Sequence, residues 1–194
     1  MNIFVLDEDP VKAAEYHCNK HVVKMILEAG QMLCAAHWLH LFKNYYKGEI
    51  TDFKRVKDLK AWLTDDANTH PLERPAWGLT HMRHPCTIWT YETTDNMEWL
   101  CSHALEMGNE RRYRWPDRAR HFSLNFIAWC YENIKDSLAP IGEQTDFAIA
   151  ISEDMTCRQV DGFNNLSSVD KYRAYYKHDK PFVEWTKRQK PSWF

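Results

Sequence analysis

The sequence predicts an all-α protein: a single compact domain of three main helices, with a short extended N-terminal segment and an aromatic C-terminal tail. The chain has 194 residues, which suits one large domain, and only six glycines, which supply few of the tight turns that a many-stranded β fold needs. Its longest segments repeat apolar residues with a helical period. No repeat and no linker rich in Pro, Gly or Ser divides the chain, so we expect one domain over residues 1–194.

The first helix is expected over residues 10–42. Asp9 is a good N-cap and Pro10 suits the first helical position, whereas Gly30 only weakens the helix interior. Residues 2–6 form a short apolar run before this helix. That run fits either a strand or an extended segment packed into the core.

Two further helices are expected over residues 85–108 and 121–138. His84-Pro85 opens the second helix, and a basic connector over 111–120 follows it. Pro140, shortly after the third helix, cannot continue it.

The composition points to an ordinary globular protein, with 44% hydrophobic and 27% charged residues. No apolar stretch is long enough to cross a membrane. The cysteines are scattered without a CxxC pair, and the acidic residues soon after Met1 do not fit a secretory signal. We therefore expect reduced thiols and a cytoplasmic protein, in the host cytoplasm if it is viral.

A polar stripe on the first helix is the main candidate site. Its members are spaced four, three, four and three residues apart, which places them on one helical face: His17, His21, Lys24, Glu28 and Gln31. Such a face can simply be solvated. The rest of this helix is very apolar, however, and the stripe carries only one full charge of each sign, which also fits a functional face.

Two chemistries fit this stripe. Lys24 and Glu28 form an acid/base pair in an apolar wall that can shift a carboxyl pKa, while the histidines contact an anionic substrate. Alternatively, His17 and His21 are two zinc ligands on successive turns. No third ligand is evident, so we expect no metal and no cofactor.

On the second helix, a face that includes His103 could pack against the stripe.

Two basic segments suggest nucleic acid despite the net charge of −2. Five arginines lie between residues 111 and 120, and seven lysines or arginines are interleaved with aromatic residues from Lys171 to Phe194. Basic groups bind phosphates and aromatic rings stack on bases, although solvated helices also carry such runs. The expected DNA contacts are His17, Lys20, His84, Arg111, Arg112, Arg114, Lys187, Arg188 and Trp193.

The chain resembles the phage-type pyrimidine-dimer DNA glycosylases, the endonuclease V UV-repair enzymes. The resemblance lies in Asn19-Lys20-His21 followed seven positions later by Glu28, in the helix after His84-Pro85 with Asn96-Met-Glu-Trp-Leu100, and in the ending Lys190-Pro-Ser-Trp-Phe194. It covers residues 1–35, 80–115 and 185–194.

This resemblance implies an all-helical enzyme, expected to be a monomer, that binds double-stranded DNA and cuts the glycosidic bond of a damaged pyrimidine. In the family an N-terminal α-amine attacks C1′ of the sugar, and the resulting imine leads to β-elimination. It assigns Glu28 the acid/base role and His21 an adjacent DNA contact. The nucleophile is left open among the α-amine of Met1, that of Asn2 after Met1 removal, and Lys24.

This sequence departs from the family in three ways. Asn2 is larger than the residue that the family exposes after Met removal, about five more residues precede the histidine, and the net charge is negative. Three other functions therefore remain open: a nucleic-acid-binding protein without imine chemistry, a metal-dependent hydrolase using His17 and His21, and a protein-interaction module with an aromatic C-terminus.

Overall fold

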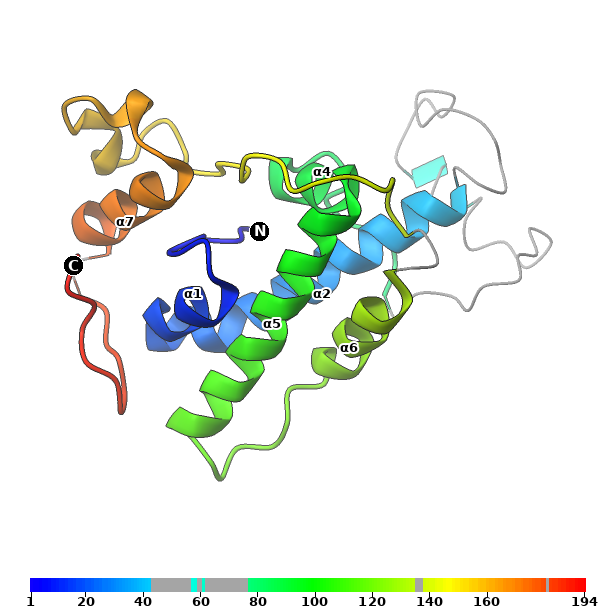
Figure 1. Cartoon of the computed structure of the whole chain (residues 1–194), viewed down its shortest axis with the longest axis horizontal. Coiled ribbons are helices and arrows are strands. Elements are labelled where there is room, and N and C mark those ends of the chain that lie inside the picture. The colour runs from blue at the N-terminus through cyan, green and yellow to red at the C-terminus, as the bar shows by residue number, and fades with distance from the viewer. Residues whose placement is uncertain (43–56, 59–60, 62–76, 135–137, 181) are drawn as a thin grey trace.

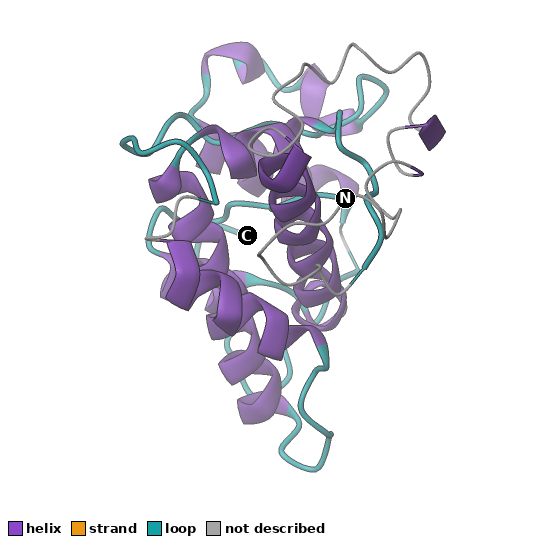
Figure 2. Ribbon diagram, turned by 90° about the vertical axis from the view of Figure 1, so that its right-hand side faces the viewer, coloured by secondary structure: helices purple, strands orange, loops and turns teal. Residues whose placement is uncertain are grey.

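The computed structural model describes residues 1–42, 57–58, 61, 77–134, 138–180 and 182–194. Within these ranges the chain is helical and contains no strand, which confirms the predicted class (Figure 2). The α-helices are α1 (Pro10–Tyr16), α2 (Asn19–Leu41), α4 (Pro85–Glu92), α5 (Thr94–Arg114), α6 (Ser123–Asn133) and α7 (Ser168–Asp179). Two short 3-10 helices, η4 (Thr156–Gln159) and η5 (Phe163–Asn165), precede α7.

The prediction of one continuous helix over residues 10–42 is wrong at a single point. The backbone turns extended at His17 and Cys18, with ψ angles of 134° and 160°, and so separates α1 from α2. The start is as expected, since the Asp9 side chain caps α1. The break is stabilised by a distant segment, because the N–H of Asn19 donates to the carbonyl of Glu184.

The second and third predicted helices need smaller corrections. Thr93 is extended and its side chain caps a new helix, so residues 85–108 divide into α4 and α5. Helix α5 continues to Arg114, which makes the first half of the expected basic connector helical. Helix α6 covers Ser123–Asn133, and residues 135–137 of the predicted span lie outside the described residues.

Helix α5 is the centre of the fold and packs against α1, α2, α4 and α6 (Figure 1). Residues 3–6 form no strand and are buried in the same core, so this apolar run is a packed segment without regular secondary structure. This brings the N-terminus into the interior of the view in Figure 1, between α4 and α7. The position of the chain start is therefore fixed by core packing.

The remaining composition-based expectations concern cysteine and the membrane. All six cysteines are buried and free. Among the described helices, none is long and apolar enough to cross a membrane. The eight described tryptophans are all buried or half-buried, so most of this aromatic content contributes to packing.

Candidate active site

The N-terminal amine lies against Glu28. The α-nitrogen of Met1 is 3.7 Å from Oε2 of Glu28, and the backbone N–H of Asn2 donates to the same oxygen at 2.9 Å. The side chains of Met1 and Glu28 are only 3% and 10% exposed. The nitrogens of Met1 and Asn2 therefore both face one carboxylate oxygen. We call Met1, Asn2, Lys24 and Glu28 the N-terminal site.

Lys24 pairs with the other oxygen of the same carboxylate. Its Nζ lies 3.0 Å from Oε1 of Glu28, one helical turn along α2, and its side chain is 60% exposed. Glu28 thus contacts three nitrogens, those of Met1 and Asn2 on Oε2 and that of Lys24 on Oε1. An amine must lose its proton before it can act as a nucleophile, and an adjacent carboxylate can accept that proton.

Side chains at the start of α4 lie beside this amine and are uncharged at neutral pH. His84 caps α4, with Nδ1 accepting from the N–H of Cys86 at 3.2 Å, and Thr87 contacts the sulfur of Met1. Burial lowers the pKa of His84, and the charges of the N-terminal amine and His81 lower it further. Burial raises the pKa of the Cys86 thiol to about 11. Glu28 is therefore the acidic side chain that the structure places in contact with this amine.

A stack of rings connects the N-terminal segment to α2 and α7. Phe4 stacks on His21 at 4.2 Å between centroids, and Tyr175 stacks on Phe4 at 5.8 Å. Lys180 lies over the Tyr175 ring at 5.4 Å. The φ of Phe4 is 43°, in the left-handed region that costs a non-glycine residue about 1–2 kcal/mol. Packing of the two rings holds this conformation.

His21 leads into a buried chain of hydrogen bonds. Its Nδ1 bonds the hydroxyl of Tyr176, which also bonds Nδ1 of His17 at 2.9 Å. Nε2 of His17 contacts Nε2 of His103 at 3.0 Å, and Nδ1 of His103 contacts the carbonyl of Pro10 at 3.1 Å. We call His21, Tyr176, His17 and His103 the buried chain. The buried chain connects His103, which lies on the face of the second predicted helix, with His17 and His21 of the polar stripe.

Burial keeps the imidazoles of this chain neutral. It lowers the pKa of His21 to about 3, with added repulsion from Lys180, Lys24 and Lys20. It lowers the pKa of His103 to about 4 and that of His17 well below its ordinary value. These groups are uncharged at neutral pH.

The structure gives no support to a zinc site at His17 and His21. Both ring nitrogens of His17 are engaged, by Tyr176 and by His103. In the described part of the chain, no three His, Cys, Asp or Glu side chains are grouped so that they could hold a metal ion.

The expected DNA contacts are distributed unevenly. Lys20, Arg112 and Lys187 are exposed, while a second group is half-buried: His84, Arg111, Arg188 and Trp193. His17 and Arg114 are 0% and 1% exposed, which removes them from any surface. Trp193 packs edge-on against Tyr16 and Tyr176, and so belongs to the fold more than to an open stacking platform.

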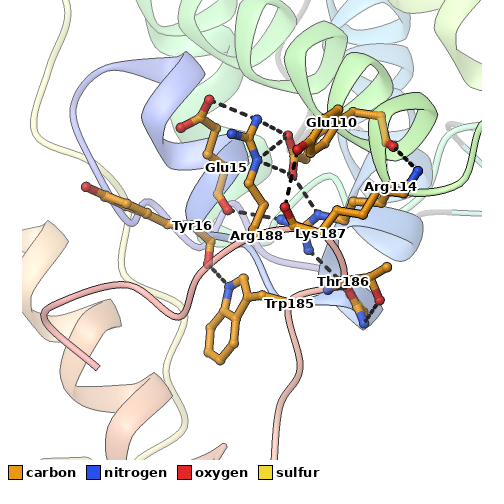
Figure 3. Close-up of polar contacts among 10 residues, drawn as sticks. Glu15, Tyr16, Glu110, Arg114, Trp185, Thr186, Lys187 and Arg188 are labelled. Carbon is orange, nitrogen blue, oxygen red and sulfur yellow. Dashed lines mark hydrogen bonds and ion pairs between the residues drawn. The ribbon is translucent and has the colours of Figure 1, made fainter.

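Arg114 and Arg188 meet on one buried carboxylate, as Figure 3 shows. Arg114 donates to Glu110 at 2.6 Å and Arg188 donates to it at 2.8 Å, while Arg188 also pairs with Glu15. Beside them, Trp185 donates to the carbonyl of Tyr16. These contacts fasten the C-terminal tail (residues 182–194) to α1 and α5.

Three residues near the N-terminal site or in the buried chain were not among the predicted site residues: Phe4, Tyr176 and Lys180. They come from the two ends of the chain, far in sequence from α2. The interleaving of lysine and tyrosine near the C-terminus was the signal for Tyr176 and Lys180, but it carried no information about their partner.

Comparisons of this chain with protein-family models, with curated proteins and with solved structures find no match.

Proposed function

We propose that this protein is a DNA glycosylase with AP-lyase activity that acts on damaged pyrimidines in duplex DNA, using its N-terminal amine as the nucleophile. The observation that carries the proposal is the position of the Met1 amine beside the buried Glu28, with the Asn2 nitrogen on the same oxygen. Nothing in an ordinary helical fold requires its chain start to lie against a carboxylate.

The proposed reaction begins with a proton transfer at the N-terminal site. Glu28 takes a proton from the ammonium group, and the free amine attacks C1′ as the bond from C1′ to the damaged base breaks. The base leaves with its electron pair and is protonated. Glu28 gives its proton to O4′ as the bond from C1′ to O4′ breaks, which opens the sugar ring to an iminium. Water then takes a proton from C2′, and the 3′ phosphate leaves with the electron pair of its bond to C3′ by β-elimination. Water then hydrolyses the imine and frees the amine.

Glu28 has a second task in this scheme. The carboxylate stabilises the positive charge that develops on the sugar and then on the iminium. Its contacts to the Asn2 nitrogen at 2.9 Å and to Lys24 Nζ at 3.0 Å hold it in place without solvent reorganisation. Lys24 is the other amine within reach of the same carboxylate and is the alternative nucleophile.

The test is strand nicking of ultraviolet-irradiated and abasic duplexes. Glu28→Gln keeps the shape of the side chain and its ability to accept from Asn2, but should lower the rate about 10²–10⁴-fold, as loss of a positioned acid/base group does. Lys24→Ala should retain activity, and Lys12→Ala, at an exposed position on α1, is its control. Full activity in Glu28→Gln contradicts the proposal. A wild type that binds DNA without nicking either substrate favours a binding protein without imine chemistry.

A further inference from the structure

We propose that Tyr176, His17 and His103 are positioning residues, which fix His21 as a hydrogen-bond acceptor for an N–H or O–H group of the bound nucleotide. This rests on the proposed function and adds a contact of defined polarity beside the nucleophile.

The direction of the buried chain follows from its far end. The carbonyl of Pro10 can only accept, so Nδ1 of His103 carries the hydrogen. A neutral imidazole has one N–H, which leaves Nε2 of His103 as an acceptor. Nε2 of His17 must therefore donate to it. Each step determines the next.

The same rule carries the polarity to His21. With its hydrogen on Nε2, His17 accepts at Nδ1 from the hydroxyl of Tyr176. The Tyr176 oxygen has then used its only hydrogen, so it accepts from Nδ1–H of His21. Nε2 of His21 is left with a lone pair and no hydrogen. Within the described residues, it has no hydrogen-bond partner of its own.

His21 shares a helical face with residues of the N-terminal site. His21 lies on α2, on the face that also carries Lys24 and Glu28, and is 4% exposed beneath the ring of Phe4. A lone pair repels a phosphate oxygen, so His21 is unsuited to the anion contact that the sequence suggests. The surrounding cations, Lys20, Lys24 and Lys180, are the groups suited to phosphate.

Nitrogen-15 NMR of the histidine rings in the full-length protein at pH 7 tests the polarity directly. We expect three neutral rings with hydrogen on Nδ1 of His21, on Nε2 of His17 and on Nδ1 of His103. A protonated Nε2 in His21, or an imidazolium there, overturns the proposal. This measurement needs no variant and no activity.

Tyr176→Phe removes the hydroxyl at the centre of the chain. We expect the His21 ring to lose its single tautomer, and kcat/KM for nicking an abasic duplex to fall about tenfold, the effect of one hydrogen bond. Affinity for undamaged duplex should not change. Tyr175→Phe is the matched control, because Tyr175 stacks on Phe4 but lies outside the chain. An unchanged His21 tautomer in Tyr176→Phe contradicts the positioning role.

The ligand contact is tested by adding a duplex that contains one borohydride-reduced abasic site, whose open sugar carries hydroxyl groups. The Nε2 resonance of His21 should shift as for an accepted hydrogen bond. A bound duplex that leaves this resonance unmoved overturns the contact. Absence of any binding overturns the proposed function and the contact with it, while the tautomers of the free protein still decide whether the chain fixes His21.

Discussion

Arginines of the same basic run have different roles in this protein, one at the surface and one in the core. Arg112 and Arg114 are two positions apart in the same basic run, yet Arg112 is exposed and Arg114 is 1% exposed. Arg114 donates to Glu110, to Asn19 and to the carbonyl of Glu15, so its guanidinium is fully used inside the protein. Counting basic residues could not separate them, because the difference depends on which face of α5 packs against α1.

This contrast leads to a stability prediction. Arg114→Ala should lower the free energy of unfolding by about 3–5 kcal/mol, because it removes one partner of a buried ion pair. Arg112→Ala should change it by less than about 0.5 kcal/mol, as exposed substitutions do. Urea denaturation of the two variants measures both. Equal effects would contradict the assignment of Arg114 to the core.

The buried histidines make stability depend on pH. Their pKa values are lowered in the folded protein, to about 3 for His21 and about 4 for His103, against about 6.5 when unfolded. Below about pH 6.5 the unfolded chain binds protons that the folded chain does not, so stability falls as the pH falls. Each histidine contributes up to about 1.4 kcal/mol per pH unit.

Urea midpoints at pH 7.5, 6 and 5 should therefore decrease steadily. His103→Gln removes one of these groups and should make the decrease shallower, whereas His178→Gln, at an exposed position on α7, should leave it as it is. Equal stability at pH 7.5 and pH 5 would be inconsistent with neutral buried imidazoles.

At the scale of elements, the sequence predicts helix identity well and helix continuity poorly. Asp9-Pro10 and His84-Pro85 mark the starts of α1 and α4 correctly. The break at His17 has no local cause, since no proline or glycine lies there. It depends on the C-terminal tail, which bonds Asn19 through the Glu184 carbonyl and through Thr186.

Replacing Asn19 is therefore expected to weaken the attachment of the C-terminal tail to α2. Asn19 accepts from the N–H of Thr186 and donates to its hydroxyl. Asn19→Ala should speed tryptic cleavage after Lys187 and Arg188 without changing the helical content. Asn164→Ala, an exposed asparagine on η5, is the control. Unchanged cleavage in Asn19→Ala would show that the tail is held mainly by its other contacts.

At the scale of the whole molecule, the N-terminal site assembles from parts that are far apart in the sequence. The spacing on α2 identified Lys24 and Glu28, because both residues lie on one helical stretch. The position of the chain start could not be derived from any period or cap. It follows from residues 3–6 packing in the core beside α2 and α4.

The positive side chains near this site are the expected duplex contacts. Lys20 and Lys24 are exposed, and Lys180 is half-buried. Reversing Lys20 and Lys180 to Glu together should weaken duplex binding. The slope of its salt dependence should fall by the equivalent of about two phosphate contacts. Lys12→Glu, at an exposed position on α1, is the control for a charge reversal. Binding that is unaffected by the double reversal would place the DNA elsewhere.

Borohydride trapping identifies the amine that attacks the sugar, which we propose is the N-terminal one. The protein is incubated with an abasic duplex and borohydride, and the covalent adduct is located by peptide mass spectrometry. We predict an adduct on the α-amine of the N-terminal residue, formed equally in Lys24→Ala and abolished when the amine is acetylated. An adduct on Lys24, or no adduct in the wild type, would contradict this account.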